Sequence, residues 1–336
     1  MSRRRLLVAA LSGGLLVLLA GCADSGSTTN EELVLYSGRS EELVAPLVES
    51  FEQQARIDVE ARYGSSAEMA ATILTEGANS PADVFFAQEP ASLGSVAALM
   101  APLPESVLSL VPDRFRDPAG LWVGTTVRSR VLAFNPDLVG GDELPASYKD
   151  LVDPKWSGKL GIAPTNASFI AFVSAQILLE GTEATLAWLQ GIAANNPVEF
   201  DGNSPIAAAV DAGDVEVGLI NHYYLLRLAD EQGSITARNH FFEVPDAGAL
   251  LMPAGASILR SARHLEASES FLRFLLSVKA QSFFAESVFE YPVVPGSPMP
   301  AGAPPLADLV TPTLAAVDLA EVLDQATDLI AEAGLL

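Results

Sequence analysis

Two neighbouring tyrosines, Tyr223 and Tyr224, are the first candidates for chemistry in this chain of 336 residues. They follow Asn221 and His222 in the stretch I-N-H-Y-Y-L-L (220–226), and they are two of only six tyrosines. A phenol has an ordinary pKa of about 10, but a bound cation stabilises the phenolate. Two phenolates facing one cleft would bring two negative charges to a single ion. The plainer alternative places one ring in the core and the other at the surface.

The elements around this pair decide between the two interpretations. The run V-G-L-I (217–220) predicts a strand, and a helix is expected over about 222–232. Neighbouring residues of a regular strand point to opposite faces, but at a strand-to-helix junction two adjacent phenols can face one cleft. Ligands of α/β sheets bind beyond the carboxyl ends of the strands. The pattern therefore favours a shared site at this strand end.

Apolar runs of strand length alternate with helix-period stretches along the rest of the chain. Strands are expected at 33–36, 57–63 and 83–86, helices at 66–74 and over one long stretch at 264–287, and Ser40 is expected to cap a helix that follows it. Such alternation predicts an α/β fold with mostly parallel strands. The chain beyond its first 30 residues is long for one compact unit and favours two lobes.

The N-terminus has the pattern of an export signal. Three arginines (3–5) precede an apolar run at 6–20 and the sequence L-A-G-C at 19–22, which is typical of a cleaved signal rather than a membrane span. Cys22, the only cysteine, follows Leu-Ala-Gly as in the bacterial lipobox. The resemblance implies cleavage before Cys22 and a lipid on its sulfur, after a signal at 1–21. A flexible tether is expected at 22–30. The alternative is an ordinary signal with a chance cysteine.

The charge of the chain limits its partners. It carries 42 acidic and 19 basic residues, a formal net charge of −23, and loss of 1–21 would remove three arginines and no acidic residue. Such a chain is not expected to bind nucleic acid through phosphates. The charge could attract cations from a distance, although a solvated acidic surface accounts for most of it.

Several short stretches together carry a resemblance to a known family. They are L-Y-S-G-R-S (35–40), N-S-P-A-D-V-F-F-A-Q (79–88), R-S-R-V (128–131), D-P-K-W (153–156), A-P-T-N-A-S-F (163–169), N-H-Y-Y (221–224) and P-D-A-G-A-L (245–250). In this order and spacing, the chain resembles the bacterial ferric-iron ABC-transporter substrate-binding proteins.

The resemblance implies a two-lobe periplasmic-binding-protein fold of the α/β class, with a hinge and an interlobe ligand cleft. The implied lobes are residues 31–127 plus 255–300 and residues 128–254 plus 301–336, with crossings near Arg128 and near 252–255. It also implies a non-enzymatic, monomeric lipoprotein on the outer face of the cytoplasmic membrane. That protein would carry Fe(III), or a ferric chelate, to an ABC permease and its ATPase.

The resemblance also implies roles for individual residues. Fe(III) is a hard cation that prefers oxygen ligands, and Tyr223 and Tyr224 match the family's phenolate ligands. A synergistic anion (carbonate, phosphate or citrate) would complete the iron sphere. The residues that match its surroundings are Asn166, Ala167, Ser168, Asn203, Asn221 and Arg128. A helix N-terminus is itself an anion site, whereas each asparagine alone could be only a helix cap or a turn residue.

The chain departs from the family pattern at three positions. Ser40 stands where many members have a histidine, and Gln88 replaces a frequent glutamate, although Glu89 follows. Phe169 stands where some members carry a third tyrosine. Arg39 could favour an anion in that lobe. Iron is therefore expected to be held by the tyrosine pair with an anion and water, or to arrive already chelated by a small organic acid.

Two other functions stay open at this point. One is a receptor of the same fold for an organic anion or a phosphorylated small molecule, bound by 166–168 and Arg128 while the tyrosines only stack. The other is an exported hydrolase, although the chain has no G-x-S-x-G elbow and no H-E-x-x-H motif. Structural roles are expected for the remaining polar candidates, His222, His240, His264 and Asp83.

Overall fold

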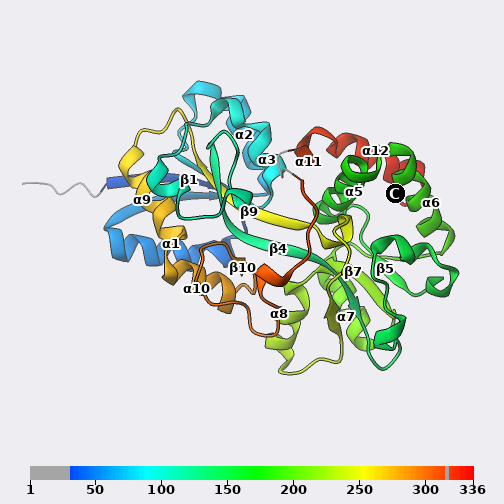
Figure 1. Ribbon diagram of the computed structural model, residues 1–336. Coiled ribbons are helices and arrows are strands. Elements are labelled where there is room, and N and C mark those ends of the chain that lie inside the picture. Colours follow the sequence, from blue (N-terminus) through cyan, green and yellow to red (C-terminus); the bar gives the residue numbers. More distant parts are fainter. Residues whose placement is uncertain (1–30, 315–317) are drawn as a thin grey trace, which may run out of the picture. The chain divides into compact units, whose positions relative to one another are not determined.

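The computed structural model describes residues 31–314 and 318–336 (Figure 1). The expected signal, the tether and Cys22 lie outside the described residues. Within the described part, no helix has both the length and the apolar character that a membrane crossing requires.

The strands and helices alternate along most of the described chain. The strands are β1 (Glu31–Ser37), β2 (Ile57–Tyr63), β3 (Val84–Ala87), β4 (Trp122–Phe134), β5 (Leu160–Ile162), β6 (Val198–Glu199), β7 (Val217–Asn221), β8 (Arg238–His240), β9 (Leu251–Ile258) and β10 (Tyr291–Pro292). The helices are α1 (Glu41–Ala55), α2 (Ser66–Glu76), α3 (Pro90–Ser95), α4 (Glu105–Leu108), α5 (Ala167–Glu180), α6 (Thr182–Ala194), α7 (Asn203–Ala212), α8 (Tyr223–Gln232), α9 (Leu265–Leu275), α10 (Val278–Glu286), α11 (Asp318–Glu321) and α12 (Leu323–Glu332).

The strands form one connected sheet in the order β2-β1-β3-β9-β4-β7-β5-β6, with β8 and β10 also paired to β4. Pairing is parallel among β1, β2 and β3 and among β5, β6 and β7, as the alternation predicts. The long strands β4 and β9 run antiparallel to their neighbours and join the two parallel groups. The first part of β4 pairs with β9, and its last five residues pair with β7.

The two groups of strands have separate hydrophobic cores. The largest cluster of the first group surrounds Phe51, Phe86 and Phe271, and the largest of the second surrounds Phe172 and Trp188, with one smaller cluster in each group. In Figure 1 the blue and orange helices lie around the first group, and the green and red helices lie around the second. The molecule therefore consists of two halves that β4 and β9 connect. The lobe boundaries given above stay a prediction.

Two local expectations need correction. The single helix expected over 264–287 is two helices, α9 and α10, because Ser277 begins the second one by accepting the N–H of Ala280 at its side-chain oxygen. Ser40 precedes α1 as expected, but its hydroxyl makes no capping hydrogen bond.

The strand ends bring distant segments together. β7 ends at Asn221 and α8 begins at Tyr223, so only His222 separates them. β5 leads through a short turn into α5, and β3 leads directly to Gln88 and Glu89 at the start of α3. The predicted strand-to-helix junction is thus present, and it belongs to the same sheet as two other strand ends that carry polar residues.

Candidate functional site

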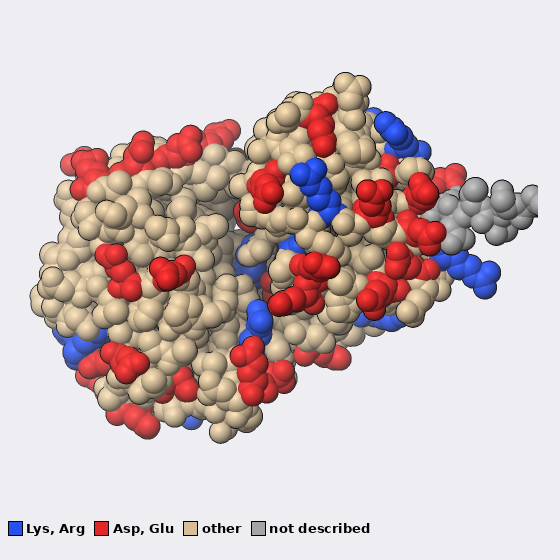
Figure 2. All heavy atoms as spheres, turned by 180° about the vertical axis from the view of Figure 1, so that it is seen from behind, with Lys and Arg blue, Asp and Glu red and all other residues tan. Residues whose placement is uncertain are grey.

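A small cavity of about 70 Å³ lies where these segments meet. Its walls are Gln88, Glu89, Arg128, Asn166, Ala167, Ser168, Ala171, Asn203, Asn221, Tyr224 and Met252. Most of the residues that the sequence predicted for ligand contact are therefore together. Segments from both halves contribute, since Gln88 and Glu89 follow β3, whereas Asn221 and Tyr224 lie at the β7–α8 junction. In Figure 2 the surface is hollowed between the two halves, and basic side chains are visible in that hollow.

Asn166 organises one wall of the small cavity. It is the N-cap of α5, and its Oδ1 accepts the backbone N–H of Ser168 at 3.0 Å and the hydroxyl of Ser168 at 2.7 Å. Asn203 donates its side-chain amide to the same oxygen at 3.1 Å. Asn203 is the first residue of α7, and its side chain does not cap that helix. The cap of α5 and the cavity wall are thus one hydrogen-bonded unit.

Arg130 lies behind this wall and was missed by the sequence analysis. Its side chain is 1% exposed, and Nη1 donates to Ser168 Oγ at 3.1 Å and to the Oδ1 atoms of Asn203 and Asn221 at 3.5 Å. Nη2 donates to the carbonyl of Leu219 at 3.0 Å. The sequence signal was available, because residues two apart on a strand share a face and R-S-R-V therefore places Arg130 beside Arg128.

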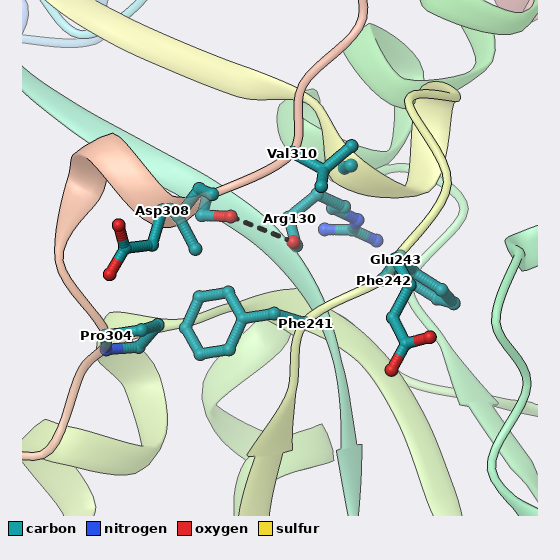
Figure 3. Close-up of a pocket in the computed structure, with 10 residues that line it drawn as sticks. Arg130, Phe241, Phe242, Glu243, Pro304, Asp308 and Val310 are labelled. Atoms are coloured by element: carbon teal, nitrogen blue, oxygen red, sulfur yellow. Dashed lines mark hydrogen bonds between the residues drawn. The ribbon is translucent and has the colours of Figure 1, made fainter.

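No carboxylate of the described chain forms an ion pair with Arg130. Arg130 also borders a separate cavity of about 210 Å³, which Asp308 and Glu243 help to line (Figure 3). In Figure 3 both of these carboxylates point away from the guanidinium. Burial lowers the pKa of Arg130 to about 9, although the interaction with Tyr224 acts to raise this pKa. Because an uncompensated buried charge is costly, an anion in the small cavity would stabilise this part of the protein.

Arg128 forms a different contact. It is 3% exposed, and its Nη2 donates to the backbone carbonyl of Gln88. β4 places Arg128 opposite Met252 of β9, where the two strands cross between the halves. This arginine therefore links the crossing strands to the segment that follows β3.

Arg39 and Ser40 do not line the small cavity. Arg39 is 1% exposed, and its two Nη atoms each lie 3.0 Å from a carboxylate oxygen of Glu290. Burial raises the pKa of Glu290, but the charges of Arg39 and Arg128 outweigh burial and hold it below its usual value. Since Glu290 accepts from both Nη groups, the guanidinium of Arg39 is not available to bind an anion with these two groups. Ser40 is exposed at the start of α1.

The two tyrosines differ in position. The ring of Tyr224 borders the small cavity, whereas Tyr223 is 6% exposed and stacks on Tyr224 with 4.2 Å between ring centroids. Burial and the neighbouring Tyr224 raise the pKa of Tyr223 well above its ordinary value. Tyr223 is therefore a neutral phenol unless a cation reaches it. Such a cation would reverse this preference, as at any metal-bound oxygen.

His222 points away from the cavity. Its Nδ1 accepts the backbone N–H of Ser129 at 3.1 Å, and its ring stacks on Tyr291 at 4.5 Å. Burial lowers the pKa of His222 to about 4, so the ring is neutral at pH 7. This supports a structural role, as expected.

The other polar candidates are structural as well. Asp83 is fully buried and accepts the backbone N–H groups of Val34, Arg263 and His264. The ring of His264 lies 2.9 Å from the same carboxylate, and His240 Nε2 lies 2.7 Å from the carbonyl of Pro145.

The charged oxygen donors at the small cavity are few. Within the described ranges, no three histidines, cysteines, aspartates or glutamates gather as a metal site would require. Glu89 borders the cavity and accepts the hydroxyl of Ser92 at 2.6 Å. A hard cation here would therefore depend on phenol oxygens, on Glu89 and on oxygens supplied by another molecule.

The chain is similar to several known solute-binding proteins. A family model described as bacterial extracellular solute-binding protein matches residues 67–312. The Fe(3+)-binding periplasmic protein of Serratia marcescens is 33% identical over 325 residues, which cover 95% of each chain. The crystal structure of iron-bound HitA from Pseudomonas aeruginosa has a TM-score of 0.84 at 35% identity, over 90% of this chain and 99% of that chain. The structure of Trichodesmium IdiA (FutA) with iron and citrate ligands has a TM-score of 0.80 at 28% identity, over 90% and 99%.

These matches cover nearly the whole described chain and confirm the predicted two-lobe α/β fold and the predicted resemblance. The chain therefore belongs to the bacterial extracellular solute-binding protein family, as a relative of its ferric-iron-binding members.

Proposed function

We propose that the chain is a non-enzymatic, lipid-anchored receptor outside the cytoplasmic membrane that binds ferric iron between its two lobes. It delivers the iron to an ABC permease and its ATPase. The names of its relatives support ferric iron as the ligand. The single observation that carries the proposal is the set of residues around the small cavity. There a phenol, a carboxylate and an anion-binding helix N-terminus meet over a buried, unpaired arginine.

In this proposal Tyr223 and Tyr224 supply phenolates to the iron, and Glu89 is the nearest carboxylate. Tyr223 reaches the metal by a small shift of the stacked ring pair. Each phenol that binds iron releases a proton, so iron affinity rises with pH. Burial disfavours the phenolate of Tyr223 in the metal-free protein. The metal is therefore required to ionise it.

The anion half of the site is proposed to be the wall around Asn166. The first amide of α5, on Ala167, has no partner inside the helix, and Ser168, Asn203 and Asn221 offer polar side chains. Arg130 donates to three of these side chains from behind and holds positive charge beside the anion. Carbonate, phosphate or the carboxylates of citrate all fit this set of donors.

The test is a titration of the metal-free chain, carrying Cys22→Ser to keep it free of lipid, with ferric citrate. Direct phenolate coordination produces a visible charge-transfer band, and the band is lost in Tyr223→Phe and in Tyr224→Phe. Tyr148→Phe is the matched control, because Tyr148 is buried in the core of the second half. Tight quenching of tryptophan fluorescence without a band would mean that iron is carried as an intact chelate. If neither the band nor the quenching is observed, iron binding is rejected.

The second candidate is a receptor of the same fold for an organic anion or a phosphorylated small molecule. The unpaired Arg130 beside the amides of α5 favours it. Under this candidate, the chain binds such an anion with the same affinity in the absence and in the presence of iron. Both tyrosine variants would then leave that affinity unchanged.

A further inference from the structure

A second cavity of about 270 Å³ adjoins the small cavity. We call it the apolar chamber, and it is lined by Ala67, Glu89, Pro90, Ala91, Ser92, Ala167, Ile170, Ala171, Met252, Leu319, Leu323, Asp324 and Thr327. Glu89, Ala167, Ala171 and Met252 line both cavities. The two cavities are therefore neighbours, and a molecule bound at the small cavity lies next to the chamber.

The walls of the apolar chamber come from both halves. α2 and α3 lie on one side, and α5, α11 and α12 lie on the other, with α11 against both α3 and α5 (Figure 1). Ala91, Met252 and Leu319 are buried at the chamber, and Ile170 and Leu323 are half-buried. The polar pair Glu89 and Ser92 is already joined by a hydrogen bond. Among the other lining residues only Asp324 and Thr327 have polar side chains, and the rest offer contacts for carbon.

The two cavities differ in what they can hold. The small cavity presents nearly all the polar donors, but its volume of about 70 Å³ is well below the 270 Å³ of the chamber. The protein supplies few charged oxygens to it, because Glu89 is the only carboxylate among its lining residues and Gln88 is a neutral amide. A bound iron would therefore take several oxygens from its own chelator. The carbon skeleton of that chelator needs space next to the small cavity.

We propose that the apolar chamber takes the hydrocarbon body of a small organic chelator whose oxygen atoms stay on the iron in the small cavity. This inference rests on the proposed function and specifies its substrate. The cargo is a ferric complex of an oxygen chelator that carries one aromatic ring or a short aliphatic chain. An all-polar chelator such as citrate gains nothing from these walls, because their contribution is burial of apolar surface.

The cavity of Figure 3 is the competing location for such a group. It lies among Phe241, Phe242, Pro304 and Val310, and it shares no lining residue with the small cavity. Arg130 lines the cavity of Figure 3 and donates one hydrogen bond to Ser168, which lines the small cavity. A chelator bound to iron beside Tyr224 therefore reaches the apolar chamber and not the cavity of Figure 3.

The test compares two ferric complexes with identical donor atoms, acetohydroxamate and benzohydroxamate, on the chain with Cys22→Ser. Binding is followed by the visible spectrum and by tryptophan fluorescence. Burial of the phenyl ring predicts that the benzohydroxamate complex binds at least about tenfold more tightly. Ala91→Phe and Thr327→Phe fill the chamber from opposite walls and reduce this preference to about twofold or less. The acetohydroxamate complex still binds to both variants.

The matched control is Ala331→Phe, which adds the same ring to an exposed position of α12 outside the chamber. It keeps the full preference for benzohydroxamate. Equal binding of the two complexes to the unsubstituted chain overturns the inference and leaves the proposed function standing. A preference that survives in both chamber variants overturns it as well. Absence of a signal with either complex and with ferric citrate removes the proposed function, and the inference with it.

Discussion

Two fully buried arginines, one in each half of the molecule, differ in whether a carboxylate balances their charge. Arg39 is matched by Glu290 in a bidentate pair. Arg130 has only neutral partners, three side-chain oxygens and a backbone carbonyl. The charge of Arg39 is balanced by the protein itself, whereas the charge of Arg130 remains available to a bound group. A buried charge thus indicates a ligand site only when the fold supplies no counter-charge.

The largest effect is expected from breaking the satisfied pair. Arg39→Met leaves Glu290 buried without its main partner and lowers the free energy of unfolding by about 3–5 kcal/mol. Urea denaturation of the metal-free chain measures this. The double variant Arg39→Met/Glu290→Met removes both charges and recovers most of the loss. A loss below about 1 kcal/mol in the single variant would show that Arg39 is not the partner on which Glu290 depends.

The next largest effect concerns the unsatisfied arginine. Phosphate at about 100 times its dissociation constant is expected to stabilise the metal-free chain by about 2.7 kcal/mol. Arg130→Met loses most of this response, because the positive charge behind Ser168 is gone. Thermal unfolding with and without phosphate checks it. An undiminished response in Arg130→Met would place the anion elsewhere.

A smaller effect is expected in the pH dependence of the stability that the Arg39–Glu290 pair contributes. The folded-state pKa of Glu290 lies below its usual value of about 4.3. Its contribution to stability is therefore fully present above that value and is lost as the pH falls through the folded-state pKa. Urea midpoints between about pH 5 and pH 3 should fall more steeply for the unsubstituted chain than for the double variant. Parallel curves would mean that the pair contributes no acid sensitivity.

The smallest effect belongs to an exposed arginine. Arg227 lies 3.9 Å from Glu231 on the surface of α8, with both side chains well exposed. Arg227→Met is expected to change the free energy of unfolding by less than about 0.5 kcal/mol and to leave the phosphate response intact. The same urea and thermal measurements apply. A loss as large as that of Arg39→Met would mean that burial is not what distinguishes the arginines.

The sequence predicted the strand-to-helix junction because strand ends and helix starts are local signals. The run before Asn221 and the tyrosines after it place the β7–α8 junction correctly, and Asn166 is recognisable as a cap from its neighbours alone.

Partners that lie far apart in the chain were not predictable in this way. Arg39 and Glu290 are 251 residues apart, and no local pattern pairs them. The stretch R-S-R-V places Arg130 on the same strand face as Arg128, but it does not show that the guanidinium reaches Asn203 and Asn221. The break between α9 and α10 was missed because a capping serine is a weak signal inside an apolar helical pattern.

The most direct test of the account is to locate the metal. Crystals of the chain loaded with ferric citrate, measured at wavelengths on either side of the iron absorption edge, would show the position of iron by anomalous scattering. Coordination by the tyrosine pair predicts one strong peak within bonding distance of the phenol oxygens of Tyr223 and Tyr224, with anion density beside Ser168. A peak away from both phenols, or no peak in a protein that binds citrate, would contradict it.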